Sequence, residues 1–257
     1  MNAGITSVIA LSLLVWIAAD VSAQPAARRE LSPTGEKIRA AMESSIRTDA
    51  ERARDRNRRP IQTLDFFGLT DDMRVLELVP GGGWYTKLLA PVLRENGVLF
   101  VAMGTAGVQR NLLNQPGFEG VKVVEVDVSS ERVGGRRLLG EFSFDVEDID
   151  LALTFRNLHN YTEEGRLAIA QAVFGSLKPG AHYGVVDHTR RHMQRDDVEN
   201  GRRMDPVMMI KEIQSVGFEL VDFSPLHYRR DDELIYEVGR RSVTGNTDRF
   251  TLLFRRP

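Results

Sequence analysis

The sequence predicts one α/β domain: a doubly wound, mostly parallel sheet with helices on both faces, plus an N-terminal helical extension. Three observations predict it. Short apolar runs that suit buried strands alternate with longer segments whose apolar residues recur at helical spacing. A chain of 257 residues with 42% hydrophobic residues is long enough for one substantial core. Three consecutive glycines, Gly81 to Gly83, connect the first strand to the helix after it.

The N-terminus is predicted to be a cleaved export signal, residues 1–23. Ile5 to Ala19 form an apolar run that is short for a membrane span. Val21-Ser22-Ala23 then places small residues at the spacing of a cleavage site, which predicts a periplasmic or secreted protein. Met1 to Gly4 contain no lysine or arginine, so an uncleaved anchor or a misassigned start are the alternatives.

Residues 24–59 are predicted to form a linker and an N-terminal helix. Ser32-Pro33 suits a helix start, with serine as the cap and proline in the first turn. The helix is expected to run to about Asn57. Its end, Arg47 to Arg56, interleaves both signs of charge, which favours a solvated or salt-bridged face. A basic lid over an acidic ligand is the alternative.

The main domain is predicted to span residues 60–257, beginning with a short amphipathic helix. Strands are expected at 74–79, 98–103, 121–126, 148–155, 182–186, 218–223 and 249–255. Further helices are expected at 84–93, 107–114, 163–177 and 205–217. Residues 129–144 show no clear pattern, and the polar residues 190–204 predict a long loop or an irregular helix.

Composition limits the partners and the chemistry. The formal net charge of −2 gives no reason to expect a nucleic-acid partner. The chain contains no cysteine, which excludes disulfides, thiolate metal sites and cysteine nucleophiles. No membrane span is expected after signal cleavage, and the oligomeric state is open.

The loops after the strands are the expected place for a ligand. In open α/β sheets, ligands bind outside the carboxyl ends of the strands, where the strand order reverses. The loops that meet this condition are Val79 to Tyr85, Met103-Gly104, Asp127-Val128, Phe155 to Tyr161 and Asp187-His188.

The glycine turn favours a nucleotide-like ligand but not every kind. A nicotinamide site requires G-x-G-x-x-G; Gly81 and Gly83 supply two glycines, whereas Thr86 stands in place of the third. The second strand ends in Met103-Gly104, without the acid that binds the ribose of such a cofactor. The turn also lacks the lysine and hydroxyl of a P-loop, and the chain has no G-x-S-x-G elbow.

Residues 60–257 resemble the class I S-adenosylmethionine-dependent methyltransferases, a Rossmann-like family, and within it a subgroup of exported predicted methyltransferases. The segments that carry this resemblance are Val75-Leu76-Glu77 to Gly83, Gly81 to Thr86, Leu177 to Ala181, Val185 to His188, Arg203 to Asp205 and Glu212 to Phe218.

The resemblance implies S-adenosyl-L-methionine as the cofactor. It implies that Glu77 faces the amine of the methionine end and that Asp127 reads the adenine amine. Arg156 follows the fourth main-sheet strand, next to the expected position of the methyl group. The full set of implied cofactor-binding residues is Glu77, Val79, Pro80, Gly81, Gly82, Gly83, Tyr85, Met103, Asp127 and Arg156. Val79 replaces the usual first glycine, and Met103 replaces the usual ribose-binding acid.

Methyl transfer to oxygen or nitrogen also needs a proton acceptor, and histidine is the usual one near neutral pH. His159 and His188 both follow strand ends, and Asp187 or Tyr161 could orient them. Structural roles are the alternatives: a helix cap or a buried carbonyl partner for His159, and a loop contact for Asp187-His188. A divalent metal bound by these residues is a further alternative, but no tight ligand spacing supports it, so no metal is predicted.

The sequence therefore predicts a methyltransferase for a small-molecule or unknown acceptor. A non-catalytic ligand-binding or scaffolding protein of this fold is the main alternative, and a nicotinamide-dependent oxidoreductase is the third. Acceptor selection would most naturally lie in residues 189–202 and in the N-terminal helix.

Overall fold

The computed structural model describes Met1 and residues 30–257, of which 31–257 form one compact unit. The predicted signal peptide falls on residues 1–23, which, apart from Met1, lie outside the described residues. Among the described helices, none is both long enough and apolar enough to cross a membrane.

A seven-stranded sheet forms the centre of the unit, in the order β3-β2-β1-β6-β7-β9-β8. The first five of these strands pair in parallel, and β9 and β8 pair antiparallel at one edge, so the predicted mostly parallel sheet is confirmed. The strands are β1 (Arg74–Leu78), β2 (Val98–Ala102), β3 (Lys122–Val124), β6 (Ile149–Phe155), β7 (Leu177–His188), β8 (Glu219–Phe223) and β9 (Arg249–Arg255).

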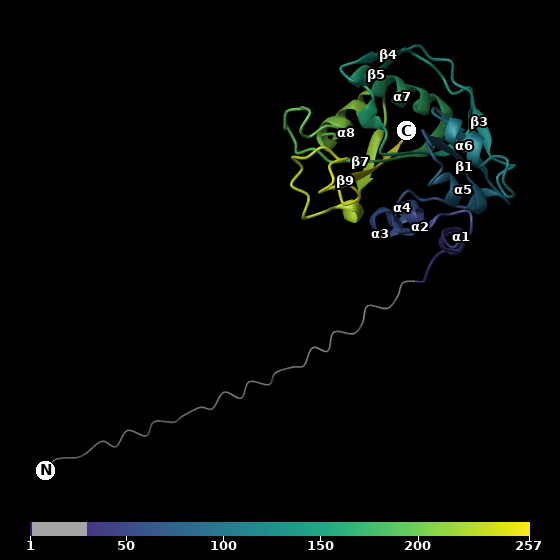
Figure 1. Cartoon of the computed structure of the whole chain (residues 1–257), viewed down its shortest axis with the longest axis horizontal. Coiled ribbons are helices and arrows are strands. Elements are labelled where there is room, and N and C mark those ends of the chain that lie inside the picture. Colours follow the sequence, from purple (N-terminus) through teal and green to yellow (C-terminus); the bar gives the residue numbers. More distant parts are fainter. Residues whose placement is uncertain (2–29) are drawn as a thin grey trace. The chain divides into compact units, whose positions relative to one another are not determined.

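Helices cover both faces of the sheet (Figure 1). The helices are α1 (Pro33–Met42), α2 (Asp49–Arg52), α3 (Asp55–Arg58), α4 (Pro60–Phe66), α5 (Thr86–Leu93), α6 (Ala106–Asn111), α7 (Glu163–Ser176) and α8 (Pro206–Ser215). Short 3-10 turns follow β6 at Leu158–Asn160 and β8 at Pro225–His227.

The sheet separates two hydrophobic cores because successive strand residues point to opposite faces. On β1, Val75 packs with side chains of α1, α4, α5 and α6. Its neighbours Leu76 and Leu78 pack on the other face with side chains of α7 and α8. Both faces of a parallel sheet are thus buried, and the strand ends are the part left for a ligand.

The N-terminal segment corrects the prediction of one helix running to about Asn57. α1 ends at Met42, and two single-turn helices follow it. Thr48 caps α2 in a reciprocal capping box with Glu51, which starts a new helix instead of continuing the old one. Arg59 then adopts φ 40°, which ends α3 before Pro60 opens α4.

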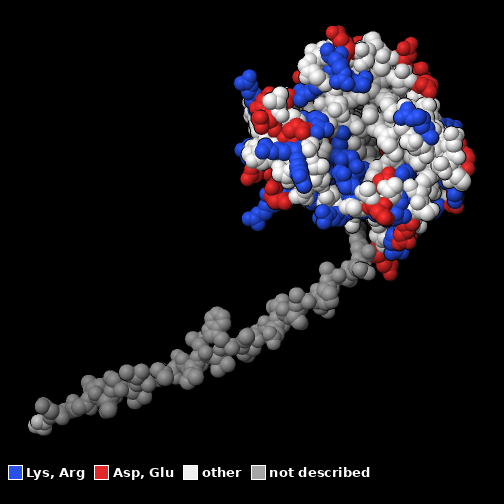
Figure 2. Space-filling model, in the orientation of Figure 1, with Lys and Arg blue, Asp and Glu red and all other residues white. Residues whose placement is uncertain are grey.

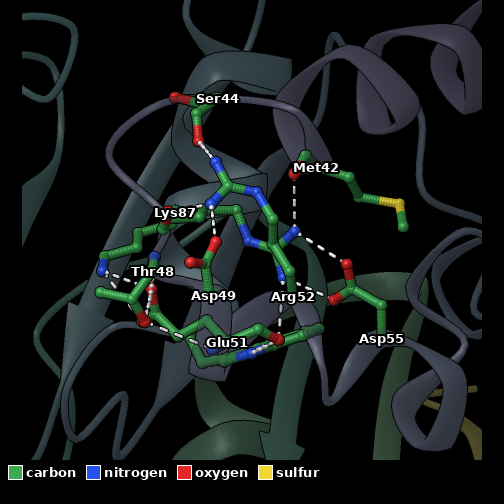
Figure 3. A network of polar contacts seen from close by, with 10 residues as sticks. Met42, Ser44, Thr48, Asp49, Glu51, Arg52, Asp55 and Lys87 are labelled. Atoms are coloured by element: carbon green, nitrogen blue, oxygen red, sulfur yellow. Dashed lines mark hydrogen bonds and ion pairs between the residues drawn. The ribbon is translucent and has the colours of Figure 1, made fainter.

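Two arginines hold this broken segment in place (Figure 3). Arg47 donates to the carbonyl of Met42 and pairs with Asp55 at 2.5 and 3.0 Å. Arg52 donates to the carbonyl of Ser44 at 2.8 Å. These guanidinium groups bind carbonyls that would have accepted backbone hydrogen bonds within a longer helix, so the breaks leave few carbonyl groups without a hydrogen-bond partner. For Arg47 and Arg52, the predicted salt-bridged face is confirmed.

The unpatterned residues 129–144 contain a hairpin that the sequence did not reveal. β4 (Ser130–Val133) pairs antiparallel with β5 (Arg136–Leu139). Gly134 and Gly135 connect them with φ of 56° and 82°, the left-handed pair that a tight hairpin turn needs. β7 also starts earlier than expected, at Leu177, so Lys178-Pro179-Gly180 lies within the strand.

His227 fastens the N-terminal segment to the antiparallel edge of the sheet. Its Nε2 lies 3.0 Å from the carbonyl oxygen of Arg58, and its Nδ1 lies 2.7 Å from the hydroxyl of Thr251 on β9. A carbonyl only accepts, so Nε2 carries the proton and Nδ1 accepts from Thr251. Burial lowers the pKa of His227 to about 4, so the neutral ring is the native form.

This arrangement predicts a loss of stability in acid. The folded pKa lies below the ordinary value of 6.5, so the stabilisation is complete above pH 6.5 and is lost as the pH falls toward 4. A shift of this size corresponds to about 3 kcal/mol. His227→Gln keeps a donor and an acceptor but does not titrate. Urea unfolding of both proteins between pH 7 and 4 should therefore show that the difference between their free energies of unfolding becomes smaller in acid. A difference that stays constant would contradict a neutral His227 in the folded protein.

Candidate functional site

The strand order reverses between β1 and β6, and the loops after these strands form the candidate site. The chain runs outward from β1 to β2 and β3, then returns to β6 on the other side of β1. Such a reversal opens a crevice at the carboxyl ends of the strands. The glycine turn lies here, with Gly81 and Gly83 at φ of 58° and 80°.

Val79 and Met103, which differ from the pattern of the family that the sequence resembles, both have left-handed backbone. Their φ angles are 50° and 61°, a region that a β-branched residue such as valine rarely enters. Each such residue costs on the order of 1–3 kcal/mol unless its surroundings hold it. Val79 donates its N–H to Ala102 at 2.8 Å, and Asn157 donates to the Val79 carbonyl at 3.2 Å. The chain thus keeps a glycine-like turn without the glycine.

Glu77 is a buried carboxyl group at the base of this turn. The hydroxyl of Thr86, the first residue of α5, donates to it at 2.7 Å. Burial raises the pKa of Glu77 to about 7, although the hydroxyl and the nearby Arg58 oppose this shift. A cationic ligand group beside Glu77 would keep it ionised at neutral pH.

Two cavities meet at Val79. The first, of about 240 Å³, lies between the glycine turn and the N-terminal helices and is lined by Glu51, Arg58, Glu77, Leu78, Val79, Pro80, Gly81, Gly82, Trp84, Tyr85, Phe155, Arg156 and Asn157. The second, of about 510 Å³, lies over the ends of β2 and β3 and is lined by Val79, Met103, Gly104, Val126, Val128, Ser130, Arg132, Gly135, Arg137, Leu139, Asn160 and Tyr161.

The structure brings most of the predicted cofactor residues to these cavities. The first cavity is lined by Glu77, Val79, Pro80, Gly81, Gly82, Tyr85 and Arg156. Met103 lines the second. Gly83 is buried under the turn, and Asp127 is exposed beside Val126 and Val128, so neither lines a cavity.

His159 and Asp187 form a buried pair. His159 Nδ1 lies 2.7 Å from Asp187 Oδ1, and the His159 backbone N–H donates to Oδ2 at 3.2 Å. Asp187 also accepts from the backbone N–H of His188 at 2.7 Å. A carboxylate at Nδ1 holds the proton on that nitrogen and leaves Nε2 as the basic one. The predicted grouping of His159, His188 and Asp187 is therefore present.

The two histidines differ in what they can do. His188 Nδ1 lies 2.8 Å from the Thr247 hydroxyl, and burial, followed by the charge of Arg249, lowers its pKa well below the usual value. His188 is thus a neutral, structural ring. His159 lines a third cavity of about 420 Å³, which adjoins the second one at Asn160. Residues 30–257 contain no group of three or more potential metal-ligating side chains.

Glu51 and Arg58 also line the first cavity and were not predicted as ligand-binding residues. Trp84 Nε1 donates to the Glu51 carbonyl at 3.1 Å, and the predicted Tyr85 stacks on Phe155 with ring centroids 3.5 Å apart. Arg58 lies over the Trp84 ring at 4.2 Å. The charged run before Pro60 was the one available signal for Arg58, but alternating charge usually indicates a solvated helix face.

Neither a family model nor a curated protein matches this sequence, whereas solved structures match its fold. A SAM-dependent methyltransferase from Aquifex aeolicus is similar with TM-score 0.55 and 15% identity over 87% of this chain and 98% of that one. The [4+2]-cyclase SpnF has TM-score 0.52 and 16% identity over 84% and 85%. The glycopeptide N-methyltransferase MtfA, in complex with S-adenosyl-L-homocysteine, has TM-score 0.52 and 14% identity over 77% and 87%.

These similarities confirm the predicted Rossmann-like methyltransferase fold. Because one neighbour is described as a cyclase, the fold leaves the reaction open, and function must be argued from the site.

The raised pKa of Glu77 predicts that the protein loses stability as the pH rises. The folded pKa of about 7 exceeds the ordinary 4.5, so the stabilisation is complete below pH 4.5 and is lost as the pH rises through 7. The loss amounts to about 3 kcal/mol. Glu77→Gln removes this pH dependence. The free energy of unfolding measured with urea should therefore rise more, relative to the unmodified protein, at pH 8 than at pH 5. Glu43→Gln, at an exposed position, is the control; an equal effect of Glu77→Gln at both pH values would contradict the prediction.

Proposed function

We propose that the protein is an S-adenosylmethionine-dependent methyltransferase that acts on a small-molecule acceptor outside the cytoplasm. The observation that most supports the cofactor is Glu77, a buried carboxyl group with one hydroxyl partner that faces the cavity beside a glycine turn. An amine at that point would satisfy the carboxylate, and the left-handed turn lets backbone N–H groups approach a ligand closely.

The two cavities suit the two ends of such a cofactor. The smaller one presents Glu77 and Arg58, which match an amine and a carboxylate. The larger one presents the apolar side chains of Met103, Val126 and Val128, which suit a flat ring. Val79 lines both cavities and marks the junction. When bound, the cofactor supplies an electrophilic methyl group; the protein supplies position and charge.

Met103 makes this a weaker site than the family pattern implies. A carboxylate at this position would add charge-assisted hydrogen bonds to the ribose, worth on the order of 1.5–3 kcal/mol. A thioether makes no comparable bond. We therefore expect a modest affinity, in the range of micromolar to millimolar dissociation constants. The same departure is the reason to retain a non-catalytic ligand-binding protein as the main alternative.

His159 is the residue we propose to remove the proton of the acceptor. Asp187 fixes the ring orientation and the tautomer, so Nε2 is the atom that receives the proton. His159 follows Phe155 to Asn157, the segment that lines the smaller cavity, and its own cavity adjoins the larger one. The acceptor would lie between them.

Calorimetry with S-adenosylmethionine and S-adenosylhomocysteine tests the proposed cofactor. We expect one site per chain and at least tenfold weaker binding in Glu77→Gln, because the amine loses its ionic partner. Glu43→Gln should bind as the unmodified protein does. No heat and no thermal stabilisation at millimolar ligand would refute the proposal; unchanged binding in Glu77→Gln would refute the site. Enhanced NADH fluorescence would instead support the oxidoreductase alternative.

The proposed location predicts the N-terminus of the exported protein. Protein recovered from the periplasm of a Gram-negative host should begin at Gln24, because Ala23 ends the small-residue motif. Ala23→Arg should block this cleavage and leave the longer chain. Recovery of unmodified protein that begins at Met1 would show that the segment is retained.

A further inference from the structure

Four arginines gather beside the smaller cavity from distant parts of the chain. Arg54 precedes α3, Arg58 is its last residue, Arg156 follows β6, and Arg249 opens β9. Arg58 and Arg156 line the cavity itself. Figure 2 shows basic side chains inside a hollow of the visible face. We call these four residues the arginine cluster.

None of the four makes an ion pair with a carboxylate of residues 30–257. The Nε atoms of Arg54, Arg58 and Arg249 are buried without a hydrogen-bond partner in this part of the chain. Three nearby carboxylates pair with other cations: Glu51 with Lys87, Asp55 with Arg47, and Asp187 with His159. Glu77 lines the same cavity but makes no ion pair with these arginines. The cluster is therefore unneutralised by the described residues.

Other buried arginines of this protein are paired. Arg203 binds Asp232 with two hydrogen bonds of 2.9 and 3.0 Å. Arg166 binds Glu212 in the same way, at 2.6 and 2.7 Å. Bidentate pairing offsets much of the cost of burying a charge, whereas an unpaired buried charge costs several kcal/mol. Arg58 and Arg249, the buried members of the cluster, thus differ from Arg203 and Arg166 in having no carboxylate partner among the described residues.

The charges in the cluster repel one another. Burial, followed by the charge of Arg156, lowers the pKa of Arg58 to about 9 and that of Arg249 to about 10. Aromatic rings hold Arg58 in place of a carboxylate, since its guanidinium lies 4.2 Å from the Trp84 ring centroid. Stacking fixes the side chain and leaves its N–H groups available to a ligand.

We propose that Arg156 and Arg249 bind an oxyanion, a carboxylate or a phosphoryl group, on the acceptor of the methyl group, while Arg58 remains for the carboxylate of the proposed cofactor. Arg54 adds charge at the edge of this site. The identity of the ligand as acceptor rests on the proposed function; the oxyanion site does not.

The number of arginines in the cluster indicates that the bound anion belongs to the acceptor and not only to the cofactor. The carboxylate of the proposed cofactor carries one negative charge and would neutralise one of four arginines. The cluster also extends past the smaller cavity toward His159 and His188, because Arg249 on β9 lies opposite His188 on β7 in the strand register. An acceptor anion at this place would lie close to His159, whose ring centroid is 5.6 Å from that of His188.

Calorimetry with inorganic phosphate and with benzoate, each with and without saturating S-adenosylhomocysteine, tests the proposal. We expect at least one anion to bind, and to bind undiminished when the cofactor product is present. Arg156→Met and Arg249→Met should each weaken binding by at least about tenfold, because a charge-assisted contact is lost. Arg241→Met, at an exposed position, is the matched control. Comparison of phosphate with benzoate identifies the oxyanion.

Thermal unfolding without anion separates a binding role from a structural one. Removing an unpaired, half-buried charge should leave Arg156→Met at least as stable as the unmodified protein, whereas loss of a structural arginine lowers stability. Arg156→Lys keeps the positive charge but lacks the planar guanidinium group, so this variant should bind the anion with intermediate affinity. No anion binding, displacement of the anion by S-adenosylhomocysteine, or unchanged binding in the variants would each overturn the proposal. Anion binding without any S-adenosylhomocysteine binding would support the oxyanion site and refute the methyltransferase.

Discussion

The site depends on three adjacent strands that leave the sheet through left-handed backbone. Val79 after β1, Met103 after β2 and Arg156 after β6 have φ of 50°, 61° and 63°. None is a glycine, so each turn carries strain on the order of 1–3 kcal/mol that the packed sheet must hold. Together these turns set the backbone around the glycine loop and place Glu77 and Arg156 on one cavity.

Local patterns predicted the fold because the sheet is built from local signals. Val75, Leu76 and Leu78 read as a buried strand, and they do divide between two cores. The N-terminal helix was mispredicted because its breaks depend on side chains that bind backbone groups: Thr48 caps a new helix with Glu51, and Arg47 and Arg52 bind carbonyls of the preceding turns. The hairpin at Gly134-Gly135 had a recognisable turn, but its strands, β4 and β5, lack apolar alternation.

The candidate site also has one part that local sequence patterns predict and one part that they do not. Glu77 and the glycine turn are neighbours in sequence, so a single motif locates them. The arginine cluster joins Arg58 to Arg249 across most of the domain, and no spacing in the sequence connects these residues. Arg58 also follows a run of alternating charges in which Arg47 and Arg52 are paired as expected. Which arginines of such a run lack a partner is decided by what the fold places opposite them.

Glu77 and Arg58 share one cavity and are both destabilised as ions by the same burial. Removal from water raises the pKa of the acid to about 7 and lowers that of the guanidinium to about 9. They make no ion pair with each other, although the charge of Arg58 favours the ionised form of Glu77. An amine on a ligand would favour the ionised form of Glu77, and an oxyanion would offset the cost of burying the charged Arg58. Burial thus disfavours the charged forms of both side chains, and a zwitterionic or anionic ligand that paired with them would offset this cost, which is the electrostatic condition for binding such a molecule there.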